Sequence, residues 1–88
     1  MKPSADELKS LFMGAFGSDV TVTDDSHLHA GHAGAAGGGG HYTVHIISER
    51  FAGLRTVQRH RLVYDVVSGW MPHRIHALSI TAKLPQES

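Results

Sequence analysis

The sequence predicts one α+β domain, a two-layer sandwich in which two helices cover one face of a three-stranded sheet. Two segments carry hydrophobic residues at three–four spacing, which is typical of helices with one buried face. Three others alternate between apolar and polar side chains, as half-buried strands do. Three strands cannot close a barrel, so the helices should cover the sheet. A chain of 88 residues has room for one hydrophobic core, so residues 1–88 are predicted to form one domain.

The first predicted element is a helix over residues 4–16. Ser4 can cap the first turn, and Glu7 can return a hydrogen bond to the backbone of Ser4, which makes a capping box. Gly17 supplies the stop, because glycine tolerates the left-handed backbone that often ends a helix. One stripe of this helix is apolar and should be buried: Leu8, Leu11, Phe12, Ala15 and Phe16.

Two strands follow, over residues 20–23 and 41–47, and we expect them to pair antiparallel. In the second, Tyr42, Val44 and Ile46 share one face, which leaves His45 on the solvent face or in a structural role. Residues 25–40 hold six glycines, four alanines and three histidines. Such a segment cannot bury a core, so it is predicted to be a flexible surface loop.

The second half of the chain predicts a short turn, a helix and a last strand. Residues 48–54 are typical of a turn or a single helical turn, and Thr56 is positioned to cap the helix that follows. The apolar spacing of that helix reaches Trp70, and Pro72 prevents its continuation. The last strand is expected over residues 75–84.

The composition excludes several classes of protein. Eight Lys and Arg balance eight Asp and Glu, which argues against a polycation that binds nucleic acid through bulk charge. The lack of cysteine excludes a disulfide framework, a thiolate zinc finger and a cysteine nucleophile. No apolar run approaches the roughly 20 residues of a membrane span, and the polar, acidic first residues are unlike a signal peptide. We expect a cytoplasmic domain with no membrane association.

Enzymatic chemistry is not indicated. No serine is accompanied by a histidine base and an orienting acid in a pattern typical of a catalytic triad. No pair of carboxylates flanks a predictable cleft. The glycine run at residues 37–40 lacks the Lys-Ser/Thr of a phosphate-binding loop. A non-catalytic protein is therefore expected.

Several segments, in order and spacing, resemble the BolA family over nearly the whole chain. They are residues 25–32 (DSHLHAGH), 41–44 (HYTV), 50–54 (RFAGL), 59–64 (RHRLVY) and 75–80 (IHALSI). The resemblance implies a class II KH-like fold with a mixed sheet and the order α-β-β-turn-α-β, which agrees with the predicted elements. The sequence departs from the family at Gly37 to Gly40, where many members carry an acidic residue before the His-aromatic pair.

The resemblance also implies a function. Members of the family pair with cytosolic monothiol glutaredoxins and share a glutathione-containing [2Fe-2S] cluster, in iron–sulfur trafficking or iron and redox sensing. We expect no cofactor bound tightly to the isolated chain, which should be a monomer or a weak dimer. Bacterial members are also regarded as DNA-binding transcriptional regulators of stress responses and morphology, and this is the alternative function.

By resemblance, the cluster ligands of this chain are His76, at the start of the last strand, and His29 in the loop, with His32 as the alternate. A chain without cysteine offers imidazole or carboxylate, and histidines do replace thiolates in Rieske-type clusters. Loop histidines are more often merely solvated. Alternatively, His27, His32 and His41 form an incidental site for zinc, nickel or copper, in a metal-buffering protein.

Arginine is concentrated in residues 50–61, which contain four arginines and no acidic residue. An arginine-rich turn and helix can hold phosphates, because guanidinium forks match their geometry. The segment resembles part of a helix-turn-helix, although the Gly-x-x-Gly loop of KH domains is missing. The alternative is that Arg59 and Arg61 pair with acids such as Asp65. The candidate nucleic-acid residues are Arg50, Arg55, Arg59, His60 and Arg61.

Overall fold

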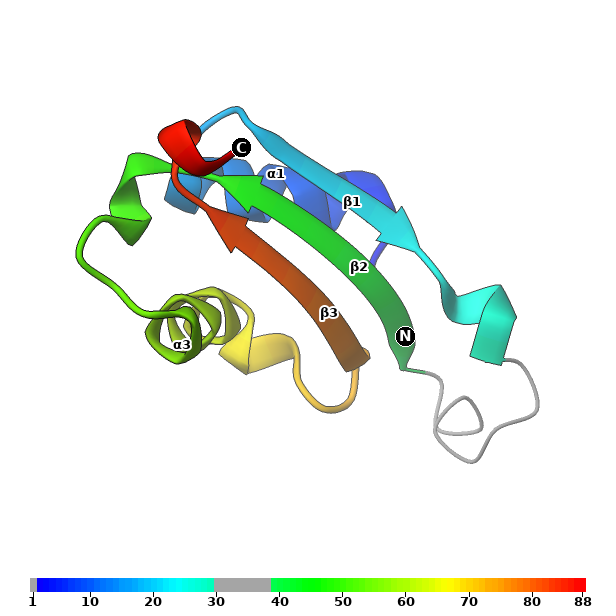
Figure 1. Ribbon diagram of the computed structural model, residues 1–88. Helices are drawn as coiled ribbons and strands as arrows, with labels where there is room; N and C mark the ends of the chain where they lie inside the picture. Colours follow the sequence, from blue (N-terminus) through cyan, green and yellow to red (C-terminus); the bar gives the residue numbers. More distant parts are fainter. Residues whose placement is uncertain (1, 30–38) are drawn as a thin grey trace.

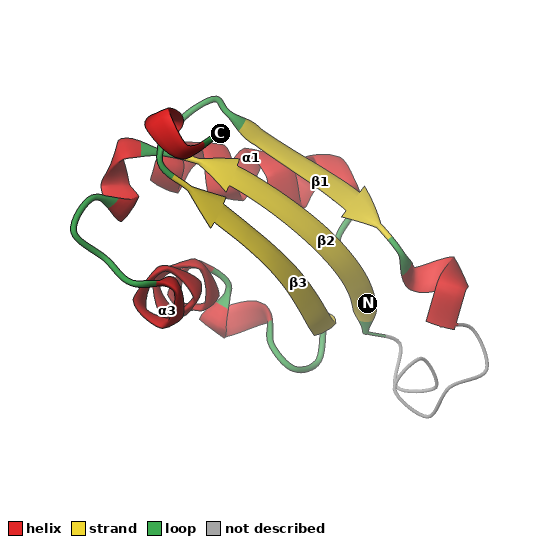
Figure 2. Ribbon diagram, viewed as in Figure 1, coloured by secondary structure: helices red, strands yellow, loops and turns green. Residues whose placement is uncertain are grey.

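The computed structural model describes residues 2–29 and 39–88. Within them lie two α-helices, α1 (Ala5–Phe16) and α3 (Thr56–Val66), and three strands, β1 (Val20–Asp24), β2 (Gly40–Ile47) and β3 (Ile75–Lys83) (Figures 1 and 2). Short 3₁₀ turns connect or end these elements: η1 (Ser26–His29), η2 (Glu49–Phe51), η3 (Ser68–Trp70) and η4 (Pro85–Glu87). In this part of the chain no helix is long and apolar enough to cross a membrane.

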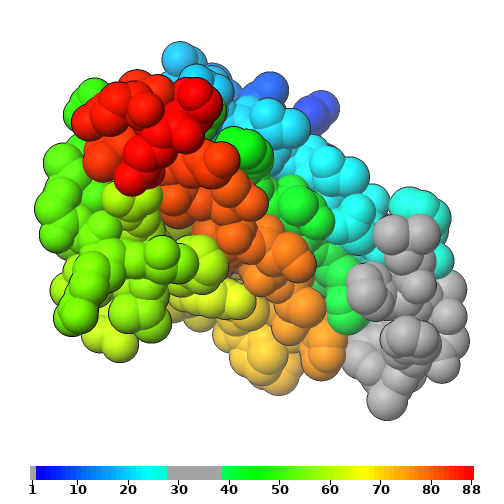
Figure 3. All heavy atoms as spheres, in the orientation of Figure 1, coloured from blue at the N-terminus to red at the C-terminus, as the bar shows by residue number. Residues whose placement is uncertain are grey.

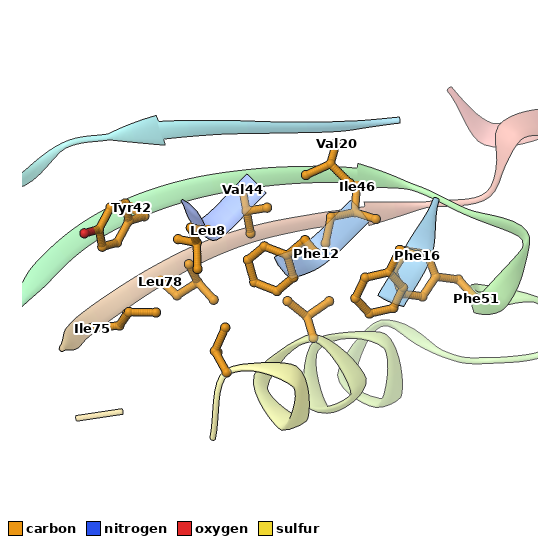
Figure 4. Close-up of a cluster of buried hydrophobic side chains, with 12 residues drawn as sticks. Leu8, Phe12, Phe16, Val20, Tyr42, Val44, Ile46, Phe51, Ile75 and Leu78 are labelled. Carbon is orange, nitrogen blue, oxygen red and sulfur yellow. The ribbon is translucent and has the colours of Figure 1, made fainter. Parts of the chain in front are cut away.

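The sheet is mixed and has the strand order β1-β2-β3. β1 pairs antiparallel with β2, and β2 pairs parallel with β3, which it reaches through the crossover that contains α3. Side chains of both helices meet the same face of the sheet (Figure 4). The structure thus confirms the predicted α+β class, its two layers and its class II KH-like order of elements.

The core lies between the sheet and the two helices. Phe12 on α1 and Val63 on α3 are both fully buried there. The predicted alternation in β2 is confirmed, since Tyr42, Val44 and Ile46 point inward (Figure 4). The buried hydrophobic residues are Leu8, Phe12, Phe16, Val20, Tyr42, Val44, Ile46, Phe51, Val63, Val67, Ile75 and Leu78.

The first helix begins and ends as predicted. The Glu7 amide donates to the Ser4 hydroxyl at 3.0 Å, and the Ser4 amide donates to the Glu7 carboxylate at 2.9 Å. Gly17 has a φ of 106°, a conformation that favours glycine. This pair of local rules is sufficient to place both ends of α1.

The prediction for the second helix was wrong at both ends. Arg55, not Thr56, holds the cap position, and its amide donates to the Gln58 side chain at 2.8 Å. The α-helix ends at Val66, and residues 68–70 form the separate turn η3. The β-branched residues Val66 and Val67, followed by serine and glycine, are poor helix formers, so the apolar spacing up to Trp70 outlasts the helix itself.

The predicted loop over residues 25–40 was too long. The Asp25 amide donates to the His41 carbonyl at 2.8 Å, residues 26–29 form η1, and β2 already begins at Gly40. Residues 30–38, including the alternate ligand His32, lie outside the described residues, and the predicted flexibility there stays a prediction.

Candidate functional site

His76 occupies a β-bulge at the start of β3. Gly40 is paired with Ile75, whereas the next residue, His41, is paired with Ala77. His76 is therefore the extra residue of β3, without a register partner on β2. Bulges bend a strand and re-aim its side chains, and here Ile75 is buried in the core while His76 is exposed. The bulge thus presents one imidazole to solvent at the end of a rigid sheet.

His41 lies against His76. The centroids of the two rings are 5.1 Å apart and the ring planes are inclined by 47°. His41 is half-buried, and its Nε2 atom is buried. From the sequence, His41 is expected only as a metal ligand together with His27 and His32. The missed signal is topological: two neighbouring parallel strands that begin together bring their first residues side by side.

The element η1 lies at the same end of the sheet (Figure 1). The His41 amide donates to the Ser26 hydroxyl at 3.1 Å, and the Asp25 amide donates to the His41 carbonyl at 2.8 Å. His29 is the last residue of η1. The backbone therefore brings the segment carrying His29 to the end of the sheet that carries His76, and ligation by this pair stays a prediction.

Two glycines bring the start of β2 close to His76. A Cβ atom on Gly39 would lie 3.0 Å from the His76 Cβ atom and 3.0 Å from the His73 carbonyl oxygen. The Gly40 amide donates to the Arg74 carbonyl at 3.0 Å. Glycine at position 39 therefore allows a close approach of two backbones, whereas a Cβ atom on Gly40 would meet the ring of Tyr42. Both are roles beyond the flexibility expected from the glycine run.

Two polar groups fix the surroundings of this end of the sheet. Burial raises the pKa of Tyr42 to about 12, and its hydroxyl donates to the Pro3 carbonyl. Burial alone would raise the pKa of Asp24, but hydrogen bonds from the Lys2 ammonium group and from Ser26 hold it at about 2. Both contacts tie neighbouring segments to the sheet.

The predicted metal site of His27, His32 and His41 includes His32, which lies outside the described residues, so this site stays a prediction. Within residues 2–29 and 39–88 no three or more His, Cys, Asp or Glu side chains form a group that could hold a metal ion. His27 is exposed on η1.

Two of the five candidate nucleic-acid residues have structural partners. The Arg50 guanidinium donates to the Ala15 carbonyl and lies 5.2 Å from the centroid of the Phe16 ring. Arg59 pairs with an acid, as the alternative prediction states, but this acid is Glu87 and not Asp65. Glu87 is distant in sequence, and η4 brings it to α3. The remaining three candidates, on or just before α3, are the exposed Arg55 and Arg61 and the half-buried His60.

Comparison with known proteins identifies the family of this chain. Residues 15–87 match the family described as BolA-like protein. The chain belongs to the BolA family. Among its relatives, Protein BOLA1, chloroplastic, of Arabidopsis thaliana is 42% identical over 73 residues. The DNA-binding transcriptional regulator BolA of Vibrio cholerae is 45% identical over 68 residues.

These relatives are longer than this BolA-family chain. The matches cover 80% of the chain and 46% of the Arabidopsis protein, and 77% of the chain and 61% of the Vibrio protein. SufE-like protein 1, chloroplastic/mitochondrial, of Arabidopsis is 42% identical over 74 residues, which are 78% of the chain and 20% of that protein.

Solved structures show the same fold. BolA1 from Arabidopsis thaliana has a TM-score of 0.81 at 35% identity, covering all of this chain and 98% of that one. The BolA domain of SufE1 from Arabidopsis has a TM-score of 0.84 at 32% identity, covering all of this chain and 99% of that one.

Proposed function

We propose that this BolA-family chain is a non-catalytic cytoplasmic adaptor that pairs with a monothiol glutaredoxin and co-ligates a [2Fe-2S] cluster. His76 supplies one imidazole and His29, or its alternate His32, the other. The observation that supports this most is the exposed His76, held by a β-bulge at the end of the sheet where η1 is anchored.

The donor set fits such a cluster. Imidazole is an established ligand of Rieske-type [2Fe-2S] centres, and this chain contains no thiolate of its own. The cysteine of the glutaredoxin and glutathione would therefore supply the sulfur ligands. The cluster is the cargo that the two proteins share.

The residues around His76 position its ring. The bulge exposes it, the ring of His41 packs beside it, and Gly39 keeps the neighbouring backbone close without filling the space. A ligand held by packed neighbours loses little conformational entropy on binding, which favours a shared site over a solvated side chain.

Cluster exchange tests the proposal. The apo chain is mixed with cluster-loaded monothiol glutaredoxin, and visible absorption and circular dichroism are followed. The wild-type chain should give a new spectrum, and His76→Ala should abolish it. His73→Ala is the matched control, because His73 is exposed three residues before His76. The same new spectrum with His76→Ala as with the wild type would reject ligation by His76.

A second candidate function is DNA binding. The named activity of the Vibrio relative supports it, together with the exposed side chains of Arg55 and Arg61. A mobility-shift titration at several salt concentrations tests this candidate. Each arginine that contacts a phosphate should reduce the salt dependence by about one ion when it is replaced by alanine. Equal binding by the wild type and the Arg55→Ala/Arg61→Ala variant would exclude this surface.

A further inference from the structure

The guanidinium group of Arg59 is held in place by hydrogen bonds to two backbone carbonyls. Its Nε donates to the Leu54 carbonyl at 2.9 Å, and its Nη1 donates to the Ala82 carbonyl at 3.2 Å. Only 14% of the side chain is exposed. These two bonds join the segment before α3 to the end of β3, and they fix the plane of the guanidinium group. The group is therefore preorganised to bind an anion.

The anion that binds the Arg59 guanidinium group in this structure is the carboxylate of Glu87. Its Oε1 accepts from Nη1 of Arg59 at 2.6 Å, and its Oε2 accepts from Nη2 at 3.1 Å. Oε1 also accepts from the Leu84 amide at 2.7 Å. The hydrogen bond from Arg59 is the main cause that lowers the pKa of Glu87 to about 2, with help from Leu84 and from the charge of Lys83. The carboxylate is thus ionised at neutral pH.

Glu87 belongs to the short turn η4, which the ion pair with Arg59 links to the first turn of α3. The surfaces of η4 (red) and α3 (light green) border each other in Figure 3. Its side chain is 41% exposed, so water and solutes can reach it. Because Leu54 and Ala82 orient Arg59 without Glu87, movement of η4 would leave the guanidinium fork open.

We propose that Arg59, with the Leu84 amide and Lys83, forms a phosphate-binding site that Glu87 fills in cis. The fork of arginine matches a phosphate as well as a carboxylate, and a phosphate dianion carries more charge than the carboxylate it displaces. The site lies at the C-terminal end of β3, whereas His76 lies at the N-terminal end. It is therefore independent of the proposed cluster ligands.

Phosphate titration monitored by NMR tests the proposal. Glu87→Ala opens the site, and Glu49→Ala is the matched control because it removes one exposed carboxylate elsewhere. If Glu87 fills the site for roughly nine-tenths of the time, its removal raises the affinity for inorganic phosphate about tenfold relative to the control. In Glu87→Ala, added phosphate should shift the NMR signals of the Leu84 amide and of the Arg59 Nε–H. Adding Arg59→Lys should remove the gain, because lysine lacks the fork.

A second probe, a DNA duplex, distinguishes between the two kinds of phosphate ligand that the site could bind. A gain for both probes indicates a nucleic-acid backbone, and a gain for inorganic phosphate alone indicates a small phosphorylated compound. Equal phosphate affinity in Glu87→Ala and Glu49→Ala, or shifts that bypass Leu84 and Arg59, would overturn the proposal. Circular dichroism of each variant shows that the comparison is made between folded proteins.

Discussion

Removing one buried hydroxyl should destabilise the domain far more than removing an exposed one. Tyr42 is 2% exposed, and its hydroxyl donates to the carbonyl of the buried Pro3. Tyr42→Phe keeps the ring but leaves that carbonyl without this donor. Leaving a buried polar group without a partner costs about 1–3 kcal/mol. A domain of this size has a total stability of about 4–13 kcal/mol, so the loss is a substantial fraction of it.

Tyr64 provides the matched control. Its hydroxyl donates to the Leu78 carbonyl at 3.1 Å, but Tyr64 is 38% exposed, so water can replace the bond in Tyr64→Phe. We expect a loss below about 0.5 kcal/mol for this variant, as for most surface substitutions. At about 4–8 °C per kcal/mol for a domain of 60–100 residues, a loss of about 1–3 kcal/mol means that Tyr42→Phe should lower the Tm by roughly 4–24 °C.

Thermal and urea unfolding, followed by circular dichroism, measure both variants. The urea dependence of the free energy of unfolding should keep the same slope, because neither change alters the surface exposed on unfolding. Equal losses in the two variants, or a larger loss in Tyr64→Phe, would show that burial of the hydroxyl does not decide its contribution.

Two further predictions concern stability. Folding lowers the pKa of Asp24 from 3.8 and of Glu87 from 4.5, both to about 2, so the unfolded chain binds more protons in acid. Their stabilisation should be complete above about pH 4.5 and lost toward pH 2. Urea unfolding at several pH values measures this, and a free energy of unfolding that falls as steeply with pH in Glu87→Gln as in the wild type would contradict it. Gly40→Ala should cost about 1–3 kcal/mol, because its Cβ would clash with the buried Tyr42 ring. A Cβ atom on Gly14 has no other atom within 4 Å, so Gly14→Ala should stabilise α1 by up to about 1 kcal/mol. A calorimetric Tm that is higher for Gly40→Ala than for Gly14→Ala would refute the clash.

The elements that follow local rules could be predicted from the sequence. Ser4, Glu7 and Gly17 specify both ends of α1 through contacts within a few residues. The alternation at Tyr42, Val44 and Ile46 identifies the buried face of β2, because a strand has a period of two.

The contacts between distant segments could not be predicted in this way. The bulge at His76 depends on the register between β2 and β3, and the pairing of Arg59 with Glu87 depends on where η4 folds back. Neither leaves a periodic pattern in the sequence. His41 was underestimated for the same reason, since only the parallel pairing places its ring beside His76.

In the proposed function, His76 binds iron in a cluster shared with a monothiol glutaredoxin. The most direct measurement is pulsed electron paramagnetic resonance of the reduced complex, with ¹⁵N-histidine incorporated only into this chain. Coupling of the electron spin to two ¹⁵N nuclei is expected for the wild type and for His73→Ala. No coupling is expected for His76→Ala, which should not form the shared cluster. A wild-type spectrum without ¹⁵N coupling, or the same coupling in His76→Ala as in the wild type, would show that His76 is not a ligand.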